Sequence, residues 1–276
     1  MKDTKNLLKP HMIAFIDIMG TKDIVLDSQK SYKKLQLLDV LLNIHDEIRQ
    51  EGNLEQLENG VRYKAEITSF SDCIAISVPL SNSFQGGAIW DSALISIQKH
   101  VSQLFSIALE KGFLVRGAIE IGELYHANHM IFGEALVKAY LQEQKATYPR
   151  IVLTDNCLAR RNDYSYIPPP LMSQQYISNL KILDYDSELD SQDAMLHTYA
   201  NLFMDYDGTI CLRMVNVQEF QNRKNPLESF GQSIRNGIND CCDDSNLKKN
   251  WIWLERYIEK EELSWKYFKT LFPSNS

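Results

Sequence analysis

The chain has 276 residues, of which 44% are hydrophobic and 24% charged, and its formal net charge is −7. This composition is typical of a folded protein with a sizeable core, and the acidic balance excludes a non-specific nucleic-acid binder, which needs a basic surface to release counterions. No apolar run approaches the roughly 20 residues that span a bilayer, and the polar residues 1–6 lack a signal-peptide core, so we expect a cytoplasmic location.

The first predicted element is a strand that carries an acid. Residues 13–18 form a short run rich in β-branched and aromatic side chains, which predicts a buried strand, and Gly20 predicts a sharp turn after it. Burying the carboxylate of Asp17 costs several kcal/mol unless it is paired, hydrogen-bonded or bound to a metal. Asp17 is therefore the first candidate functional residue.

Two amphipathic helices and a hairpin are predicted next. Residues 31–50 and 90–112 show helical spacing of apolar side chains, and residues 61–70 and 73–78 are predicted strands joined by a turn at Ser71 and Asp72. The side chains of the first helix that we expect to cover the sheet are Leu35, Leu38, Leu41, Leu42, Ile44 and Ile48.

A further strand, a helix and a last short strand are predicted over residues 114–125, 134–145 and 151–153. In the first of them Arg116 and Glu120 alternate with apolar side chains, which predicts one core face and one polar face. The order of elements predicts an α+β fold with a ferredoxin-like βαββαβ core and an added helix and strand.

We expect a first domain over residues 1–160 and a C-terminal extension over residues 161–276. Three consecutive prolines within residues 162–170 predict a linker or a surface excursion, and an Asp-Gly pair within residues 202–215 predicts a β-hairpin. Two helices are predicted to follow, over residues 226–242 and 247–268. The aromatic side chains of the second are expected to pack on the core or on a dimer partner: Trp251, Trp253, Tyr257, Trp265, Tyr267 and Phe268.

Asp17 and Asp72 are predicted to converge, because the first strand and the hairpin are neighbours in a βαββαβ sheet. Two carboxylates at close range repel each other, and hard divalent cations relieve that repulsion. We therefore expect a pair of Mn²⁺ or Mg²⁺ ions, as in enzymes of phosphoryl transfer. Gly20, Thr21 and Lys22 offer backbone N–H groups, a hydroxyl and a cation to a polyphosphate.

Each of these residues alone has a simpler interpretation. Asp17 could cap a helix or belong to an ion pair, Asp72 could be an ordinary turn residue, and Lys22 could be solvated. Arg116 could pair across strands with Glu120 or with Glu66. Only the joint pattern predicts a nucleotide site.

The joint pattern resembles the class III nucleotide cyclases over about residues 12–155. Phe15-Ile16-Asp17-Ile18 is similar to the first metal-binding strand of that family, and Ser71-Asp72-Cys73 is similar to its hairpin. Residues 116–122 and 132–136 match a later strand and the turn that opens the last catalytic helix. The resemblance implies that Asp17, Asp72 and the carbonyl of Ile18 are metal ligands.

The chain departs from the purine cyclases at the positions that read the base and stabilise the transition state. Thr68 stands in place of the base-reading Lys, and Met130 in place of the second base-reading acid. Val137 and Leu141 replace the Asn and Arg of the last helix. We therefore do not expect an adenylate cyclase.

A closer resemblance is to the pyrimidine cyclases of bacterial anti-phage Pycsar systems. It is carried by residues 14–18, 68–72, 116–119, 132–140 and 146–151. It implies conversion of UTP to cyclic UMP and pyrophosphate, a head-to-tail homodimer with active sites between subunits, and a separate effector protein that senses the product. UTP is favoured over CTP by resemblance alone, and a cytidylate cyclase remains the alternative.

These resemblances, together with the residue chemistry, assign an expected role to each candidate residue. Asp17, Asp72 and Arg116 are the predicted catalytic residues, and Arg116 and Lys138 are the candidates for transition-state stabilisation. The predicted substrate-binding residues are Phe15, Gly20, Thr21, Lys22, Thr68 and Lys138.

The sequence has three other interpretations. A nucleotidyltransferase of the diguanylate-cyclase or polymerase-palm type is disfavoured by the lack of a Gly-Gly-acid-acid-Phe run on the hairpin. A non-catalytic dimerisation or sensor module is the second alternative, and the retention of both acids counts against it. A zinc site on His126 and His129 lacks a third ligand, and the five cysteines follow no framework spacing, so we expect free thiols.

Overall fold

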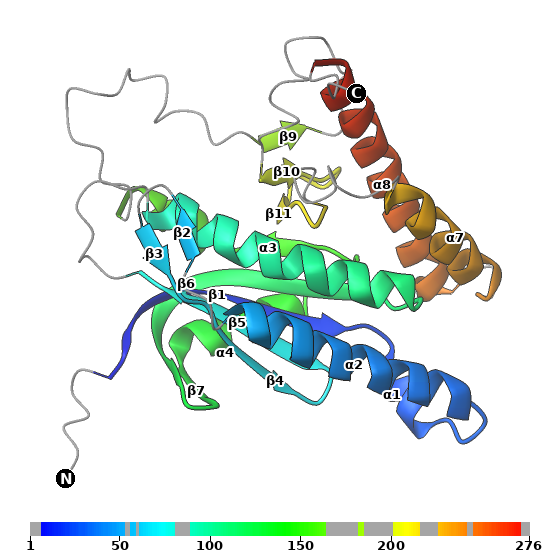
Figure 1. Cartoon of the computed structure of the whole chain (residues 1–276), viewed down its shortest axis with the longest axis horizontal. Helices are drawn as coiled ribbons and strands as arrows, with labels where there is room; N and C mark the ends of the chain where they lie inside the picture. Colours follow the sequence, from blue (N-terminus) through cyan, green and yellow to red (C-terminus); the bar gives the residue numbers. More distant parts are fainter. Residues whose placement is uncertain are drawn as a thin grey trace.

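The computed structural model describes residues 7–52, 56–58, 61–80, 89–163, 182–184, 201–215, 226–241 and 245–271. Its centre is an antiparallel sheet in the order β4-β5-β1-β6, shown in Figure 1. These strands are β1 (Lys9–Ile18), β4 (Glu66–Phe70), β5 (Cys73–Pro79) and β6 (Val115–Ala127). Helices α2 (Ser31–Gly52) and α3 (Ile89–Glu110) connect them, so the predicted α+β, ferredoxin-like βαββαβ core is confirmed.

The sheet continues beyond β6 into the C-terminal part of the chain. Strand β8 (Ile151–Leu153) runs parallel to β6, and the β10–β11 hairpin (Leu202–Met204 and Ile210–Leu212) pairs with β8. The predicted Asp-Gly turn is confirmed, with Gly208 at a φ of 77°. The hairpin therefore extends the core sheet. Strands β9 (Ile182–Asp184) and β7 (Met130–Gly133) pair with β10 and β6, and most of the predicted linker lies outside the described residues.

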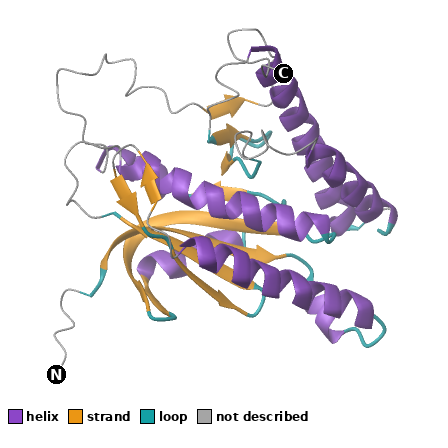
Figure 2. Ribbon diagram, in the orientation of Figure 1, coloured by secondary structure: helices purple, strands orange, loops and turns teal. Residues whose placement is uncertain are grey.

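The two faces of the sheet are covered unequally. Helices α2 and α3 lie on one face, and α4 (Glu134–Glu143) lies against β1 and β6 on the other (Figure 1). Helices α7 (Pro226–Asn239) and α8 (Asn246–Leu271) run alongside each other next to α3, as Figure 2 shows. Both agree with the predicted helices. The remaining helical segments are α1 (Thr21–Leu26), α5 (Asp155–Ala159) and the 3₁₀ helix η1 (Arg160–Asp163).

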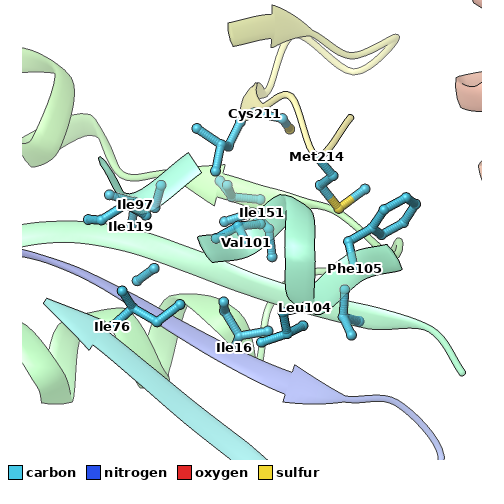
Figure 3. Close-up of a cluster of buried hydrophobic side chains, with 14 of the residues drawn as sticks. Ile16, Ile76, Ile97, Val101, Leu104, Phe105, Ile119, Ile151, Cys211 and Met214 are labelled. Atoms are coloured by element: carbon cyan, nitrogen blue, oxygen red, sulfur yellow. The ribbon is translucent and has the colours of Figure 1, made fainter. Parts of the chain in front are cut away.

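The main core lies between the sheet and α3. Figure 3 shows Ile16, Ile76 and Ile119 of the strands facing Ile97 and Val101 of α3. All five side chains are fully buried, and each such burial stabilises the fold by about 1.5–3 kcal/mol. This packing fixes β1, and with it the position of Asp17.

The prediction of which α2 side chains cover the sheet was partly wrong. Ile44 is buried and Leu41 packs half-buried against the core, as predicted, whereas Leu37 and Val40 are buried although we did not expect it. The side chains of Leu35, Leu38 and Leu42, which we expected to be buried, are 66%, 51% and 55% exposed, and that of Ile48 lies outside the described part of the chain. The helix carries two adjacent apolar stripes at the same spacing, and only tertiary packing decides which one faces inward.

The predicted strand over residues 61–70 is interrupted. Its first part is β3 (Val61–Tyr63), which pairs with β2 (Gln56–Glu58), and its second part is β4. None of the described helices combines the length and apolarity needed to cross a membrane. Cysteines 73, 157, 211 and 241 are free thiols, as predicted for them.

Candidate metal and nucleotide site

Asp17 and Asp72 meet at one end of the sheet. Asp17 is paired across strands with Cys73 on one side and with Arg116 on the other. Asp72 lies in the β4–β5 turn, where Ser71 adopts a φ of 59° and the Asp72 carbonyl accepts a hydrogen bond from the Ile18 amide at 3.1 Å. One ligand atom each of Asp17, Asp72 and Cys73 lies within 4.8 Å of the others. The structure thus brings together the two predicted acids.

The Asp17 carboxyl is in an unfavourable place for a negative charge. Burial is the largest cause and raises its pKa to about 6, with further increases from the nearby Glu143 and Asp72 carboxylates and a partial offset from Arg116. Burial likewise raises the pKa of Glu143, which lies at the end of α4. An ionised Asp17 therefore gains from any additional positive charge at this position.

Arg116 lies among these acids and does not pair with Glu120 or Glu66. Its guanidinium is 3.5 Å from the Asp17 carboxylate and 2.5 Å from that of Glu143, and it donates to the Ala146 carbonyl at 3.4 Å. Two carboxylates thus share a single guanidinium, and the Asp72 carboxylate is close enough to raise the pKa of both, so negative charge is in excess at this site. Divalent cations with oxygen ligands fit such a site.

Cys73 is the third side chain of the cluster. Its thiol donates toward Asp17 at 3.8 Å and toward Asp72 at 4.0 Å. Burial and the neighbouring carboxylates raise the pKa of Cys73 to about 12, so the thiol is neutral at physiological pH. Two of the three donors of the cluster are carboxylate oxygens, which suit Mg²⁺ or Mn²⁺.

The turn predicted to hold phosphates leads into the short helix α1. Gly20 has a φ of 78°, which favours glycine, and its carbonyl accepts the first helical hydrogen bond, from Ile24. The Thr21 hydroxyl is buried and donates to the Ile18 carbonyl at 2.6 Å, while Lys22 is exposed. Lys22 therefore lies just after β1 and is exposed to solvent. The hydroxyl of Thr21 is engaged in a hydrogen bond within the turn.

The other predicted substrate residues lie on the face of the sheet that carries Asp17 and is covered by α4. Phe15 is buried and contacts the half-exposed rings of Phe70 and Tyr140, with ring centroids 5.9 and 5.6 Å away. Thr68 is half-buried on β4. Lys138 pairs with Glu134 at 3.1 Å on the solvent side of α4, so it is not joined to the acidic cluster.

Sequence reasoning missed Cys73 and Glu143 as members of the site. Cys73 is adjacent to a predicted ligand, so its position gave a local signal. Glu143 follows Ala135 and Ala139 at intervals of four residues, and all three face the sheet. An acid that continues a stripe of small buried residues could have indicated a buried carboxylate.

His126 does not form a zinc site with His129. Its Nε2 is hydrogen-bonded to Thr68 Oγ1 at 2.9 Å, and its Nδ1 to Ser77 Oγ at 2.8 Å. Both ring nitrogens are used, so neither has a lone pair for a metal. The described residues contain a single cluster with metal-ligand spacing, that of Asp17, Asp72 and Cys73.

Comparisons with known proteins add little to this picture. No protein-family model matches the chain, and no curated protein matches it. Among solved structures, adenylyl cyclase CyaB from P. aeruginosa shares 18% identity at a TM-score of 0.38, over 56% of this chain and 82% of that chain. Two structures of a bacterial light-regulated adenylyl cyclase share 14% identity at TM-scores of 0.34 and 0.35, over 55% and 60% of this chain and 44% and 86% of theirs. At these TM-scores the likeness assigns no function, and the functional argument rests on the site.

Proposed function

We propose that this protein is a nucleotide cyclase of the class III type that converts UTP to 3′,5′-cyclic UMP and pyrophosphate. The observation that carries the proposal is the meeting of Asp17 and Asp72 beside Arg116, with more negative than positive charge, at the end of a βαββαβ sheet. A cytidylate cyclase that makes cyclic CMP is the alternative within the same chemistry. A cyclase-like module without activity is disfavoured because a half-buried carboxylate with a raised pKa is retained.

The acidic cluster would hold the ions through oxygen atoms of Asp17 and Asp72, with the Ile18 carbonyl as the third predicted ligand. Bound Mg²⁺ or Mn²⁺ would lower the pKa of the ribose 3′-hydroxyl and neutralise charge on the phosphates. Arg116 lies between Asp17 and Glu143 and would stabilise negative charge on the reacting phosphate. Gly20 and Lys22 would contact the β- and γ-phosphates.

A homodimer with sites between subunits is part of the proposal. The sheet face that carries Asp17 is covered by α4 alone among the described helices, and apolar side chains around it are exposed. Those exposed side chains, each 40–68% accessible, are Phe70, Met130, Phe132, Val137, Tyr140 and Leu141. A second copy of the chain seated there would bury them and close the nucleotide site. We further propose that the product acts as an anti-phage signal for a separate effector protein.

The test is to incubate the purified protein with each of the four ribonucleoside triphosphates and Mn²⁺ or Mg²⁺, and to identify products by mass. We expect cyclic UMP and pyrophosphate from UTP. Cyclic CMP as the main product would select the alternative, and a lack of any cyclic product would contradict the cyclase proposal. Sedimentation of the same preparation tests the dimer.

A further inference from the structure

A chain of hydrogen bonds lies on the sheet face that carries Asp17 and ends at Thr68. Among the described helices only α4 covers this face, which we call the open face. Ser77 on β5 is fully buried and bonds to His126 Nδ1, while His126 Nε2 bonds to Thr68 on β4. Both distances, 2.8 and 2.9 Å, are those of ordinary hydrogen bonds. His126 is itself only 6% exposed. The proposed reaction gives these buried groups no role.

The buried Ser77 hydroxyl decides which group donates in each of these two hydrogen bonds. The Ser77 hydroxyl has no partner other than His126 among the described residues, and a buried hydroxyl hydrogen without an acceptor is costly. Ser77 therefore donates to Nδ1, and the proton of the neutral imidazole is on Nε2. Burial lowers the pKa of His126 to about 4, which keeps the ring neutral at physiological pH.

This tautomer fixes what Thr68 offers to a ligand. The Nε2–H group donates to Thr68 Oγ1, so the threonine hydrogen is not used inside the protein. No other partner of the Thr68 hydroxyl occurs among the described residues, and the side chain is half-exposed. Thr68 therefore presents a hydrogen-bond donor to the open face.

Thr68 lies at a suitable place for the base of a bound nucleotide. The cross-strand row Phe15, Ala75 and Thr68 is next to the row Asp17, Cys73 and Phe70, and both rows face the same side. From the spacing of strands and residues, Thr68 and Asp17 are about 12 Å apart between Cα atoms. The aromatic rings of Phe15 and Phe70 lie between them and offer a surface for stacking.

We propose that Ser77 and His126 act as positioning residues that make Thr68 a hydrogen-bond donor to the substrate base, and that this donor selects a uracil carbonyl over a cytosine amino group. The inference rests on the proposed cyclase function and names its specificity. An amino group in the same place would require the hydroxyl to turn its hydrogen away and to accept with its one remaining lone pair, because the other accepts from His126. We expect this poorer fit to reduce kcat/KM about tenfold or more.

The first test measures kcat/KM for UTP and CTP in Thr68→Val, which removes the hydroxyl and keeps the shape. We expect kcat/KM for UTP to fall about tenfold or more while that for CTP changes less than about threefold. Ser69→Ala is the matched control, because Ser69 is the next residue of β4 and faces the opposite side. An unchanged UTP-to-CTP ratio in Thr68→Val would overturn the inference and leave the cyclase proposal intact.

The second test examines the positioning residues. His126→Gln keeps a side-chain N–H donor for Thr68 and should retain most of the preference for UTP, whereas His126→Leu should lose it. Equal loss in both variants, with unchanged thermal unfolding, would contradict the proposed donor role.

The third test does not depend on activity. In the nucleotide-free protein, ¹⁵N shifts of His126 should show a protonated Nε2 and an unprotonated Nδ1. A proton on Nδ1 would overturn the inference whatever the turnover. By contrast, a protein that neither turns over nor binds UTP or CTP would overturn the cyclase proposal and the specificity inference together.

Discussion

Two arginines, the half-buried Arg116 and the buried Arg150, contact acids whose pKa values are shifted in opposite directions. Arg150 donates to Asp207 at 2.7 and 3.0 Å and to Asp205, and it holds the pKa of Asp207 well below its usual range. Arg116 is 3.5 Å from Asp17, yet burial and the nearby acids raise the pKa of Asp17 to about 6. An arginine–aspartate contact therefore stabilises the negative charge of Asp207, whereas the contact at Asp17 does not offset burial and repulsion from the neighbouring acids.

The difference lies in the balance of partners. Around Arg150 the acids are satisfied further, since Trp253 donates to Asp205 at 3.0 Å and the Thr209 amide donates to Asp207 at 3.0 Å. Around Arg116 the Asp17 and Glu143 carboxylates share one guanidinium, the Asp72 carboxylate raises the pKa of both, and the only other donor to Asp17 among the described residues is the Cys73 thiol at 3.8 Å. The Arg150 cluster is balanced, because its acids have several hydrogen-bond donors, and it joins the hairpin to the sheet. The Arg116 cluster is unbalanced, because its acids have too few donors, and it retains the capacity to bind a cation.

The largest effect is expected from removing the acids of the unbalanced cluster. Asp17→Ala and Asp72→Ala should each lower turnover at least about 1,000-fold, because charge on the reacting phosphate is no longer neutralised. The measurement is cyclic nucleotide formation by mass. Asp27→Ala, an exposed acid between α1 and α2, is the control and should keep full activity. Full activity in either site variant would remove the metal assignment.

A smaller but still large effect is expected from Arg150→Met. This change leaves Asp205 and Asp207 without their partner, and it should lower the free energy of unfolding by about 3–5 kcal/mol. Arg116→Met should cost less than half as much, because Asp17 and Glu143 already have raised pKa values and can bind protons instead. Urea unfolding of both variants measures the difference, and equal losses would contradict the contrast between the two clusters.

Asp17→Asn should stabilise the metal-free protein. The pKa of Asp17 is about 6 when folded and 3.8 in its usual state, so the stability that protonated Asp17 contributes is complete below pH 3.8 and lost as the pH rises through 6. The neutral amide avoids this loss. We expect a gain of about 1 kcal/mol at pH 7.5 and almost none at pH 4, allowing for partial solvent screening. A destabilised Asp17→Asn protein at pH 7.5 would show that the site is not strained by charge.

The smallest effect is expected from Cys73→Ser. A neutral thiol contributes only a weak hydrogen bond to the acids, and a hydroxyl can replace it, so turnover should change less than about threefold. A loss of more than tenfold with Mg²⁺ would show that sulfur, and not only oxygen, takes part in binding the ion.

Much of the architecture could be predicted from local patterns. The period of apolar residues identified α3, α7 and α8, and the Asp-Gly pair identified the β10–β11 turn, because these preferences act between residues close in the chain. The order of elements then predicted the βαββαβ sheet and the proximity of Asp17 to Asp72. For these features the sequence was sufficient.

Other features depend on packing between distant segments. The sequence offered two equivalent apolar stripes on α2, and only contact with the sheet and α3 selected the stripe of Leu37, Val40 and Ile44. Likewise, His126 finds Thr68 and Ser77 at separations of 58 and 49 residues. Hydrogen bonds and ion pairs act over a few ångströms, so which polar groups meet was decided by the tertiary structure, whereas the sequence by itself determined the elements and the two acids they carry.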